Sequence, residues 1–275
     1  MCRWIAYVGS PIALDEVIIK PARSLVQQSK HAREGAEATN GDGFGIGWYG
    51  EAPEPGLFRS IGPAWNDRNL LDVARLTKSG LFFGHIRAST GSAVQQTNCH
   101  PFRHGRWLWM HNGLIRDFVR IKRELMLSVD AALYPFMEGS TDSELMFYLA
   151  LTFGLQDDPQ TAVARMVGYV EEVGRQHGIE HPMQMTVATS DGRSIWAFRY
   201  SSEGSSRSLY YSSAVPTLRE MYPEVVQFAA VSEHSRLIVS EPLGELAGVW
   251  NVVPESSFGV VSEHRSELLT FRPLT

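Results

Sequence analysis

The order of the hydrophobic patterns along the chain is the feature that most constrains its fold. Mostly strand-like segments come first, two long helical segments follow in the middle, and strand-like segments return towards the end. An order of strands, then helices, then strands is typical of an α+β protein in which helices cover packed sheets. We therefore expect two sheets sandwiched between helical layers, in a single domain that covers residues 1–275.

Local signals set the expected boundaries of the elements. Thr141-Asp142-Ser143-Glu144 has the form of a capping box, which predicts a helix over Leu145–Phe153, and Pro159 opens a second helix that ends near Gln176. Earlier helices are expected over Pro21–Ser29 and Asn69–Leu76. Strands are expected over Arg3–Val8, Gly43–Tyr49, Leu57–Ile61, Leu81–Ile86, Arg106–Met110, Gln184–Thr189, Ser194–Tyr200, Leu209–Ser212, Arg236–Val239, Val249–Val253, Phe258–Val261 and Leu268–Phe271.

Composition excludes several classes of partner. A net charge of −5 offers no basic surface of the kind that nucleic acids or anionic membranes require. The first residues lack the apolar core of a signal peptide, and no apolar run approaches the length of a membrane span. With two cysteines, Cys2 and Cys99, no disulfide framework is indicated, and no cluster has the spacing of a zinc site. We expect a cytoplasmic protein without metal or cofactor.

Cys2 is the candidate nucleophile. Removal of Met1 would leave a thiol and a free α-amine on the same residue. The amine has an ordinary pKa of about 7.7–8.0 and the thiol one of about 8.5, so either group can hold the proton near neutral pH. An N-terminal amine that serves as the base for its own nucleophile is a known form of covalent catalysis.

Arg87 ends the apolar strand-like segment Gly84-His85-Ile86. A guanidinium group is costly to bury there unless it meets an anion, and its fork has the right shape to hold a carboxylate with two hydrogen bonds. The alternative is an internal salt bridge to one of the acidic side chains of the chain itself.

His111-Asn112-Gly113 ends a second apolar strand-like segment. The side-chain amide of Asn112 and the backbone N–H of Gly113 are two donors of the kind that stabilise an oxyanion, although Asn-Gly alone predicts a turn. Asp142 begins the capped helix, where the helix dipole alone is enough to favour a carboxylate. The alternative interpretation is that the Asp142 carboxylate binds a cationic group of a ligand. Together with Cys2 and Arg87, these groups suit an amide substrate that is also an α-amino acid, such as glutamine or a γ-glutamyl compound.

Two further features of the sequence are assigned structural roles. The glycine-rich segment Asn40–Gly47 precedes a strand instead of the helix that a dinucleotide motif requires, and it lacks the full set of calcium ligands. We interpret it as a tight loop that brings backbone close to another segment. Cys99 precedes His100, but adjacent residues on a strand face opposite ways, so we expect Cys99 to be structural.

At this point the chain resembles the class II glutamine amidotransferases, a branch of the N-terminal-nucleophile hydrolases, and within them the stand-alone YafJ-type subgroup. The order and spacing of several motifs carry the resemblance. The family motifs are Met1-Cys2, Gly41–Gly45, Gly84–Arg87, His111–Gly113 and Ser140–Glu144, and the subgroup segments are Pro63–Asp67, Asn98–Phe102 and Val239–Leu243. After Arg87 the chain reads Ala88-Ser89-Thr90-Gly91, without the Trp and second His of the sugar-phosphate amidotransferases.

The resemblance implies a four-layer αββα sandwich and a set of catalytic roles. Cys2 would be the nucleophile, with its freed α-amine as the general base, and Asn112 and Gly113 would form the oxyanion hole. A γ-glutamyl thioester on Cys2 would form and then be hydrolysed to glutamate.

The same resemblance implies how the substrate is bound. Arg87 would hold the α-carboxylate with help from Thr90, and Asp142 would hold the α-ammonium group. His85, in the same motif as Arg87, is a further candidate for substrate binding. Two alternatives to direct hydrolysis remain at this stage: supply of ammonia to a separate acceptor subunit, and a non-catalytic sensor of γ-glutamyl ligands.

Overall fold

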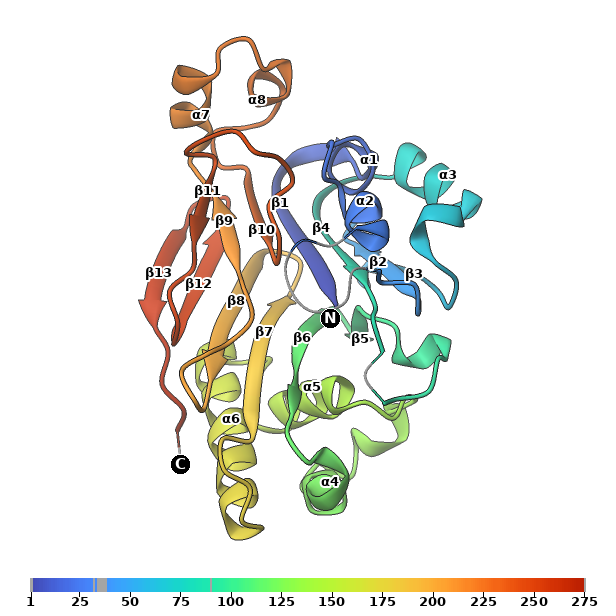
Figure 1. Ribbon diagram of the computed structural model, residues 1–275, viewed down its shortest axis with the longest axis vertical. Helices are drawn as coiled ribbons and strands as arrows, with labels where there is room; N and C mark the ends of the chain where they lie inside the picture. Colours follow the sequence, from blue (N-terminus) through green and yellow to red (C-terminus); the bar gives the residue numbers. More distant parts are fainter. Residues whose placement is uncertain (1, 32, 34–38, 90, 275) are drawn as a thin grey trace.

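The computed structural model describes residues 2–31, 33, 39–89 and 91–274, and these form two antiparallel sheets with helices on their outer faces (Figure 1). Sheet A contains β1 (Arg3–Ala13), β2 (Phe44–Trp48), β3 (Gly56–Ser60), β4 (Lys78–Ile86), β9 (Tyr210–Ser212), β10 (Arg236–Val239) and β11 (Trp250–Val252). Sheet B contains β5 (Phe102–His104), β6 (Trp107–Ile115), β7 (Met183–Ser190), β8 (Ser194–Ser201), β12 (Ser257–Ser262) and β13 (Ser266–Thr270). The α-helices are α1 (Asp15–Ile18), α2 (Leu25–Lys30), α3 (Arg68–Leu76), α4 (Phe118–Leu127), α5 (Asp142–Thr152), α6 (Pro159–Gln176), α7 (Val215–Met221) and α8 (Val226–Ala230).

The strand order explains why the N-terminal strand is central. In the described residues, sheet A runs β11-β9-β10-β1-β4-β2-β3 and sheet B runs β13-β12-β8-β7-β6-β5. β1 pairs with β4 on one side and with β10 on the other. Both edges of β1 are therefore hydrogen-bonded, which fixes the residue that immediately precedes it.

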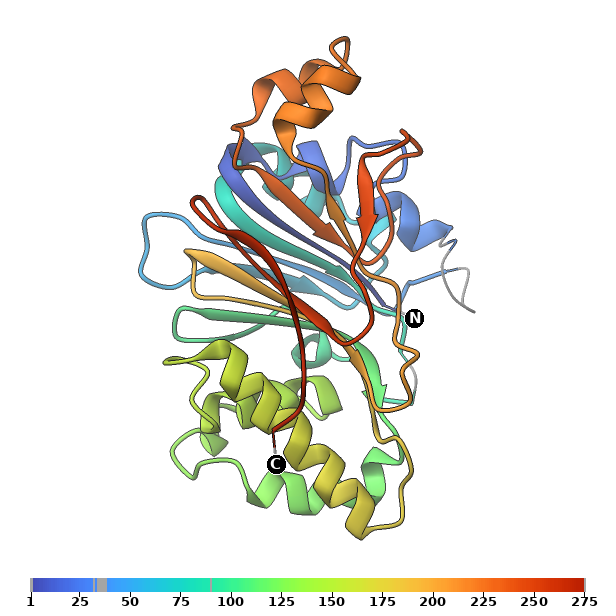
Figure 2. The same cartoon turned by 90° about the vertical axis from the view of Figure 1, so that its left-hand side faces the viewer.

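The side view shows four layers, with the two sheets between layers of helices (Figure 2). Three apolar clusters lie between these layers. Helices α1, α2 and α3 cover sheet A through a cluster that includes Ile18 and Phe82. The two sheets pack on each other through a cluster that includes Trp4 and Met110. Helices α5 and α6 cover sheet B through a cluster that includes Trp109. The predicted α+β sandwich with αββα layers is confirmed.

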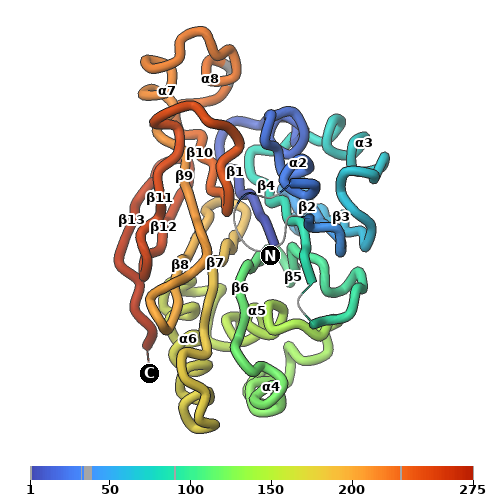
Figure 3. The backbone as a smooth tube through the Cα atoms, viewed as in Figure 1, coloured from blue at the N-terminus to red at the C-terminus, as the bar shows by residue number. Residues whose placement is uncertain are grey.

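Strand alternation determines which polar residues face the layer between the sheets. Met110 of β6 packs between the sheets, whereas Trp109 packs against the helices. Because successive side chains alternate, Asn112 shares the inner face with Met110, and His111 shares the helix-covered face with Trp109. The trace in Figure 3 shows the start of β1 beside β6 in the middle of the molecule.

The observed elements agree closely with the predicted ones where local signals are strong. The predicted bounds of α6 and β10 are those observed. The helix predicted from Pro21 begins only at Leu25, because Ser24 is its N-cap and accepts a hydrogen bond from the Gln27 N–H. No described helix has both the length and the apolar character needed to cross a bilayer.

One strand differs from its prediction in a way that matters for the site. The strand predicted to end at Met110 continues to Ile115, because β6 pairs with β7 along its whole length. His111-Asn112-Gly113 therefore lies inside a strand and does not form a turn.

A buried ion cluster anchors the start of β1. The Arg3 Nε lies 3.0 Å from the Oε2 of Glu241, and the Arg23 guanidinium group contacts the Oε1 of the same carboxylate. Arg3 also donates a hydrogen bond from Nη1 to the Cys2 carbonyl oxygen at 2.9 Å. The loop after β10 thus holds the backbone of the candidate nucleophile.

We expect Glu241→Gln to lower the free energy of unfolding by about 3 kcal/mol, because it leaves two guanidinium groups, one of them buried, without their shared carboxylate. Urea denaturation measures the change. The matched control is Asp72→Asn, which breaks an exposed ion pair with Arg75 and should cost less than about 0.5 kcal/mol. Equal, small effects of the two substitutions would contradict a structural role for the cluster.

Candidate active site

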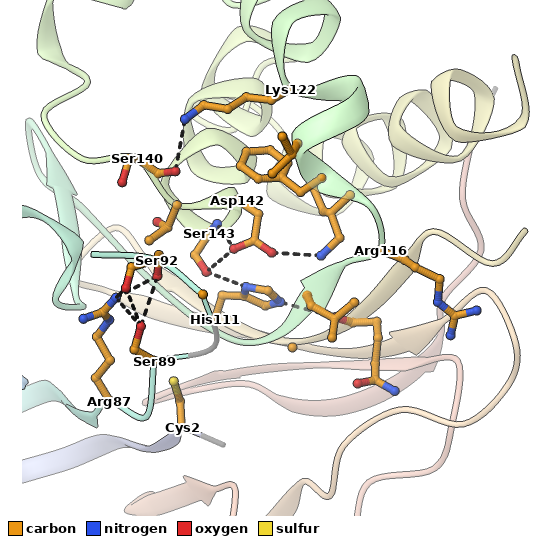
Figure 4. Close-up of a pocket in the computed structure, with 18 of the residues that line it drawn as sticks. Cys2, Arg87, Ser89, Ser92, His111, Arg116, Lys122, Ser140, Asp142 and Ser143 are labelled. Atoms are coloured by element: carbon orange, nitrogen blue, oxygen red, sulfur yellow. Dashed lines mark hydrogen bonds between the residues drawn. The ribbon is translucent and has the colours of Figure 1, made fainter. Parts of the chain in front are cut away.

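A cavity of about 680 Å³ opens beside the start of β1, within the size range of small-molecule sites (Figure 4). Cys2, Arg87, Gly113 and Asp142 all line it. These residues come from the start of β1, the segment after β4, strand β6 and the start of α5. Four of the residues selected from the sequence thus meet in one cavity, although they are far apart along the chain.

Cys2 is half-buried, and its thiol donates a long hydrogen bond of 3.6 Å to the Ala88 carbonyl oxygen. Burial raises the pKa of the thiol, and the positive charges of Arg87 and Arg3 partly oppose that effect. Since the thiolate is the nucleophilic form, the Cys2 thiol needs a proton acceptor to react near neutral pH.

The guanidinium group of Arg87 is almost fully buried, and its hydrogen-bond acceptors are neutral. Nη2 donates to the Ser92 hydroxyl at 2.8 Å and to the Ala93 carbonyl at 3.0 Å, and Nη1 donates to the Asp42 carbonyl at 3.2 Å. Arg87 forms no ion pair with any carboxylate that the structure describes, so the internal salt bridge considered above is not found. A buried cation with neutral partners at the wall of a cavity favours an anionic ligand group.

Asp142 is held by backbone donors from two elements. Its Oδ2 accepts a hydrogen bond from the Ile115 N–H of β6 at 2.8 Å, and its Oδ1 accepts one from the Ser143 N–H at 2.7 Å. The Ser143 hydroxyl also lies 3.2 Å from Oδ1, and Oδ2 keeps a further lone pair for a ligand. The carboxylate is thus fixed in direction and contributes negative charge to the cavity wall.

The two predicted oxyanion donors lie on opposite faces of β6. Gly113 lines the cavity, and a Cβ atom at this position would lie 1.9 Å from the Gln184 carbonyl oxygen, so no larger residue fits. Asn112 is buried on the inner face, and its carbonyl oxygen accepts a hydrogen bond from Thr186. The Thr186 hydroxyl in turn accepts one from the Trp4 indole at 3.2 Å, so Asn112 lies close to the residues that follow Cys2.

His85 does not line the cavity, contrary to what a substrate-binding role requires. It is fully buried behind the site, its ring stacks on that of His100 at 4.1 Å, and its Nε2 lies 3.3 Å from the His111 carbonyl oxygen. Strand alternation in β4 turns it towards sheet B, a direction that the motif alone does not reveal. Thr90 and Met1, for which roles were also predicted, lie outside the described residues.

The structural roles assigned from the sequence agree with the geometry. Cys99 is buried, and its thiol donates to the Ser60 carbonyl oxygen at 3.5 Å. Gly43 has a φ of 119°, and a Cβ atom there would lie 2.6 Å from the Cys99 sulfur. The glycine-rich segment therefore does allow a close backbone approach, and a strand, β2, follows it.

Three residues of the site region were not selected from the sequence. His100 and His111 line the cavity and are buried, and Ser143 bonds to His111. Both ring nitrogens of His100 lack a hydrogen-bond partner within the described part of the chain. Burial lowers the pKa of His85 to about 3, and it also lowers the pKa values of His100 and His111. These imidazoles are thus neutral near pH 7.

Comparison with known proteins agrees with this geometry. The family model described as "Glutamine amidotransferases class-II" matches residues 18–245. The chain is 34% identical over 288 residues to the "Probable glutamine amidotransferase DUG3" of Saccharomyces cerevisiae, which covers 94% of this chain and 80% of the yeast protein. It is 30% identical over 136 residues to the γ-glutamyl-hercynylcysteine sulfoxide hydrolase of Mycolicibacterium smegmatis, which covers 48% of this chain and 60% of that protein. A solved structure of a glutamine aminotransferase class-II domain protein from Silicibacter pomeroyi matches with a TM-score of 0.76 and 33% identity over 100% of both chains.

The buried histidines predict a loss of stability in acid. Each has a lower pKa in the folded protein than its ordinary value of about 6.5, so unfolding takes up protons as the pH falls below that value. We expect the free energy of unfolding to fall by up to about 1.4 kcal/mol per pH unit for each such histidine. Urea denaturation at several pH values measures the slope.

His85→Phe should make this slope shallower by about one proton, because the phenyl ring keeps the stacking and cannot be protonated. His264→Gln is the control: His264 is 85% exposed, so its replacement should leave the slope unchanged. A slope that is the same in the wild type and in His85→Phe would show that His85 is not responsible.

Proposed function

Because this chain belongs to the class II glutamine amidotransferases, and is therefore an enzyme, we propose that it hydrolyses the γ-amide bond of glutamine or of a γ-glutamyl compound through a thioester on Cys2. One observation carries the proposal: a single cavity contains a thiol, a guanidinium group with no carboxylate partner among the described residues, and a fixed carboxylate. An α-amino acid with a side-chain amide has the three complementary groups.

In this proposal Arg87 and Asp142 bind the α-amino acid end of the substrate. The α-carboxylate meets the Arg87 guanidinium group, whose present partners are neutral and carry no competing charge. The α-ammonium group meets the Asp142 carboxylate. Binding both charged ends fixes the direction of the chain between them, which brings the γ-carbonyl carbon to the sulfur of Cys2.

The reaction then uses the nucleophile and its own amine. After removal of Met1, the α-amine of Cys2 takes the thiol proton, and the sulfur adds to the γ-carbonyl carbon. The oxyanion that forms is stabilised by the Asn112 amide and the Gly113 N–H. The ammonium group then gives its proton to the leaving nitrogen, the C–N bond breaks and a γ-glutamyl thioester remains. Water adds to the thioester carbonyl, the C–S bond breaks, and glutamate and the free thiol are released.

Direct hydrolysis of a γ-glutamyl compound is favoured over ammonia supply to a separate subunit. The mycobacterial relative is named as a hydrolase of a γ-glutamyl compound, and this chain is 30% identical to it over 136 residues. We expect the purified chain alone to release glutamate from a γ-glutamyl dipeptide. Glutamate assays with the dipeptide and with glutamine measure this. Release from glutamine alone, rising only when a partner is added, would favour ammonia supply.

The covalent step can be tested by intact mass. We expect the purified protein to lack Met1 and to gain one adduct with diazo-oxo-norleucine, a glutamine-like electrophile that alkylates the activated thiol. Cys2→Ala should gain none. The matched control is Cys99→Ala, which removes the other, buried cysteine and should still gain one adduct. An adduct that persists in Cys2→Ala, or a chain that keeps Met1 and nonetheless reacts, would contradict the proposed nucleophile and base.

A further inference from the structure

A chain of hydrogen bonds connects the buried face of β6 to Asp142. The Nδ1 of His111 lies 2.8 Å from the Ser143 hydroxyl oxygen, and that oxygen lies 3.2 Å from the Oδ1 of Asp142 (Figure 4). The Nε2 of His111 lies 3.4 Å from the Gln184 carbonyl oxygen. His111 and Ser143 are buried, whereas Asp142 is partly exposed to the cavity. The mechanism proposed above uses neither His111 nor Ser143.

The number of protons available determines the direction of these bonds. The Gln184 carbonyl can only accept, so in the neutral tautomer that makes this bond the Nε2 of His111 carries the proton. In the neutral imidazole Nδ1 then holds a lone pair and accepts the single hydroxyl proton of Ser143. In this tautomer the single hydroxyl proton cannot also serve the 3.2 Å bond from Ser143 to the Asp142 Oδ1, which the other neutral tautomer allows. In both tautomers the imidazole is uncharged, so the Asp142 carboxylate keeps its negative charge for the cavity.

Protonation of His111 allows the bond to Gln184 and the bond from Ser143 to Asp142 to form at the same time. The Nδ1–H then donates to the Ser143 oxygen, and the hydroxyl proton turns to the Oδ1 of Asp142. An imidazolium group is thereby joined to the carboxylate through one hydroxyl group. Its positive charge offsets the charge of Asp142 by the same electrostatic attraction that a bound ammonium group would use.

The other titratable groups near His111 do not replace Asp142 in this role. His85 of β4 and His100 before β5 face it across the site and are held neutral by burial. Burial also lowers the pKa of His111, and the negative charge of Asp142 from α5 opposes that shift. Asp142 is therefore the charged side chain that acts on His111 among the described residues.

We propose that His111 and Ser143 are positioning residues that set how strongly Asp142 binds the α-ammonium group of the substrate. Neutral His111 leaves the Asp142 carboxylate to the ammonium group, and protonated His111 competes with that group for the same carboxylate. The inference rests on the proposed function, in which Asp142 is the ammonium site. Because coupling is reciprocal, ligand binding and protonation of His111 oppose each other, and affinity falls in acid.

The test measures the Kd of glutamine by calorimetry in the Cys2→Ala chain, which binds without turnover. We expect the Kd to rise about fivefold or more from about pH 7.5 to about pH 5, a range in which glutamine itself keeps its charges. Adding His111→Gln should remove this rise, because an amide side chain bonds to Ser143 and takes up no proton. Adding Ser143→Ala should reduce the rise, because it removes the hydroxyl that joins the two groups.

Glutaramate, which has the carboxylate and the amide of glutamine but no α-amine, is the control ligand. Its Kd should not show the acid rise, because it makes no use of the Asp142 charge. An equal acid rise in Kd with glutaramate overturns the inference, and so does an unchanged rise for glutamine in His111→Gln. If His111→Gln does not fold, the inference is tested by Ser143→Ala together with glutaramate. A rise that is not reduced in Ser143→Ala, or that also occurs with glutaramate, then overturns it. A Kd for glutamine that does not change with pH overturns the proposed role of His111 and Ser143 but leaves the proposed function intact. Absence of glutamine binding at every pH overturns the proposed function and the inference with it.

Discussion

The packing of sheet A against sheet B at the start of β1 is the constraint on which the site depends. Trp4 is fully buried between the sheets, and its indole donates to the Thr186 hydroxyl of β7. Thr186 pairs in register with Asn112, to whose carbonyl it donates. The residue two positions after Cys2 is thus tied to the strand that carries both proposed oxyanion donors. Because β1 is hydrogen-bonded on both edges, the position of Cys2 follows from the sheets and not from a loop.

The charged groups available to a ligand in the cavity are those that have no oppositely charged partner among the described residues. Arg87 has neutral partners, and Asp142 is bonded to backbone N–H groups, so each keeps its charge for a ligand. By contrast, the carboxylate of Glu241 is used up by arginines within the protein. The buried histidines add no positive charge near neutral pH, because burial disfavours the protonated imidazole. Arg87 and Asp142 thus present one positive and one negative group to the cavity, which matches a zwitterion such as an α-amino acid.

Local signals were sufficient to predict most elements, and non-local pairing explains the main differences. The bounds of α6 follow from Pro159 and from the periodicity of the helix, which are local. The continuation of β6 past Met110 depends on pairing with β7, which lies far along the chain, and Asn-Gly on its own favours a turn. One half of the predicted capping box is observed, because the Thr141 hydroxyl accepts a hydrogen bond from the Glu144 N–H. In the other half, the Glu144 carboxylate accepts from the Glu138 and Gly139 N–H groups and not from the Thr141 N–H.

The candidate site shows the same division. Cys2, Arg87, Gly113 and Asp142 were selected from residue chemistry and motif order, and the fold brings them to one cavity. The direction of His85 could not be predicted, because it depends on which face of β4 meets the other sheet. Ser143 had a sufficient local explanation in the helix start, so nothing in the sequence connected it to a histidine 32 residues earlier.

That connection changes how the two motifs should be regarded. His111 precedes Asn112, and Ser143 follows Asp142. The 2.8 Å hydrogen bond between His111 and Ser143 therefore joins the motif of the proposed oxyanion donors to the motif that holds the carboxylate. Residues that share one hydrogen-bond network have effects that do not add. We therefore expect non-additive effects when a residue beside the reacting amide and a residue beside the α-amine are substituted together. The connection runs through β6 and α5, because the Ile115 N–H of β6 also binds Asp142. In the proposed mechanism, the strand that would stabilise the reacting carbonyl also orients the carboxylate that would bind the amine.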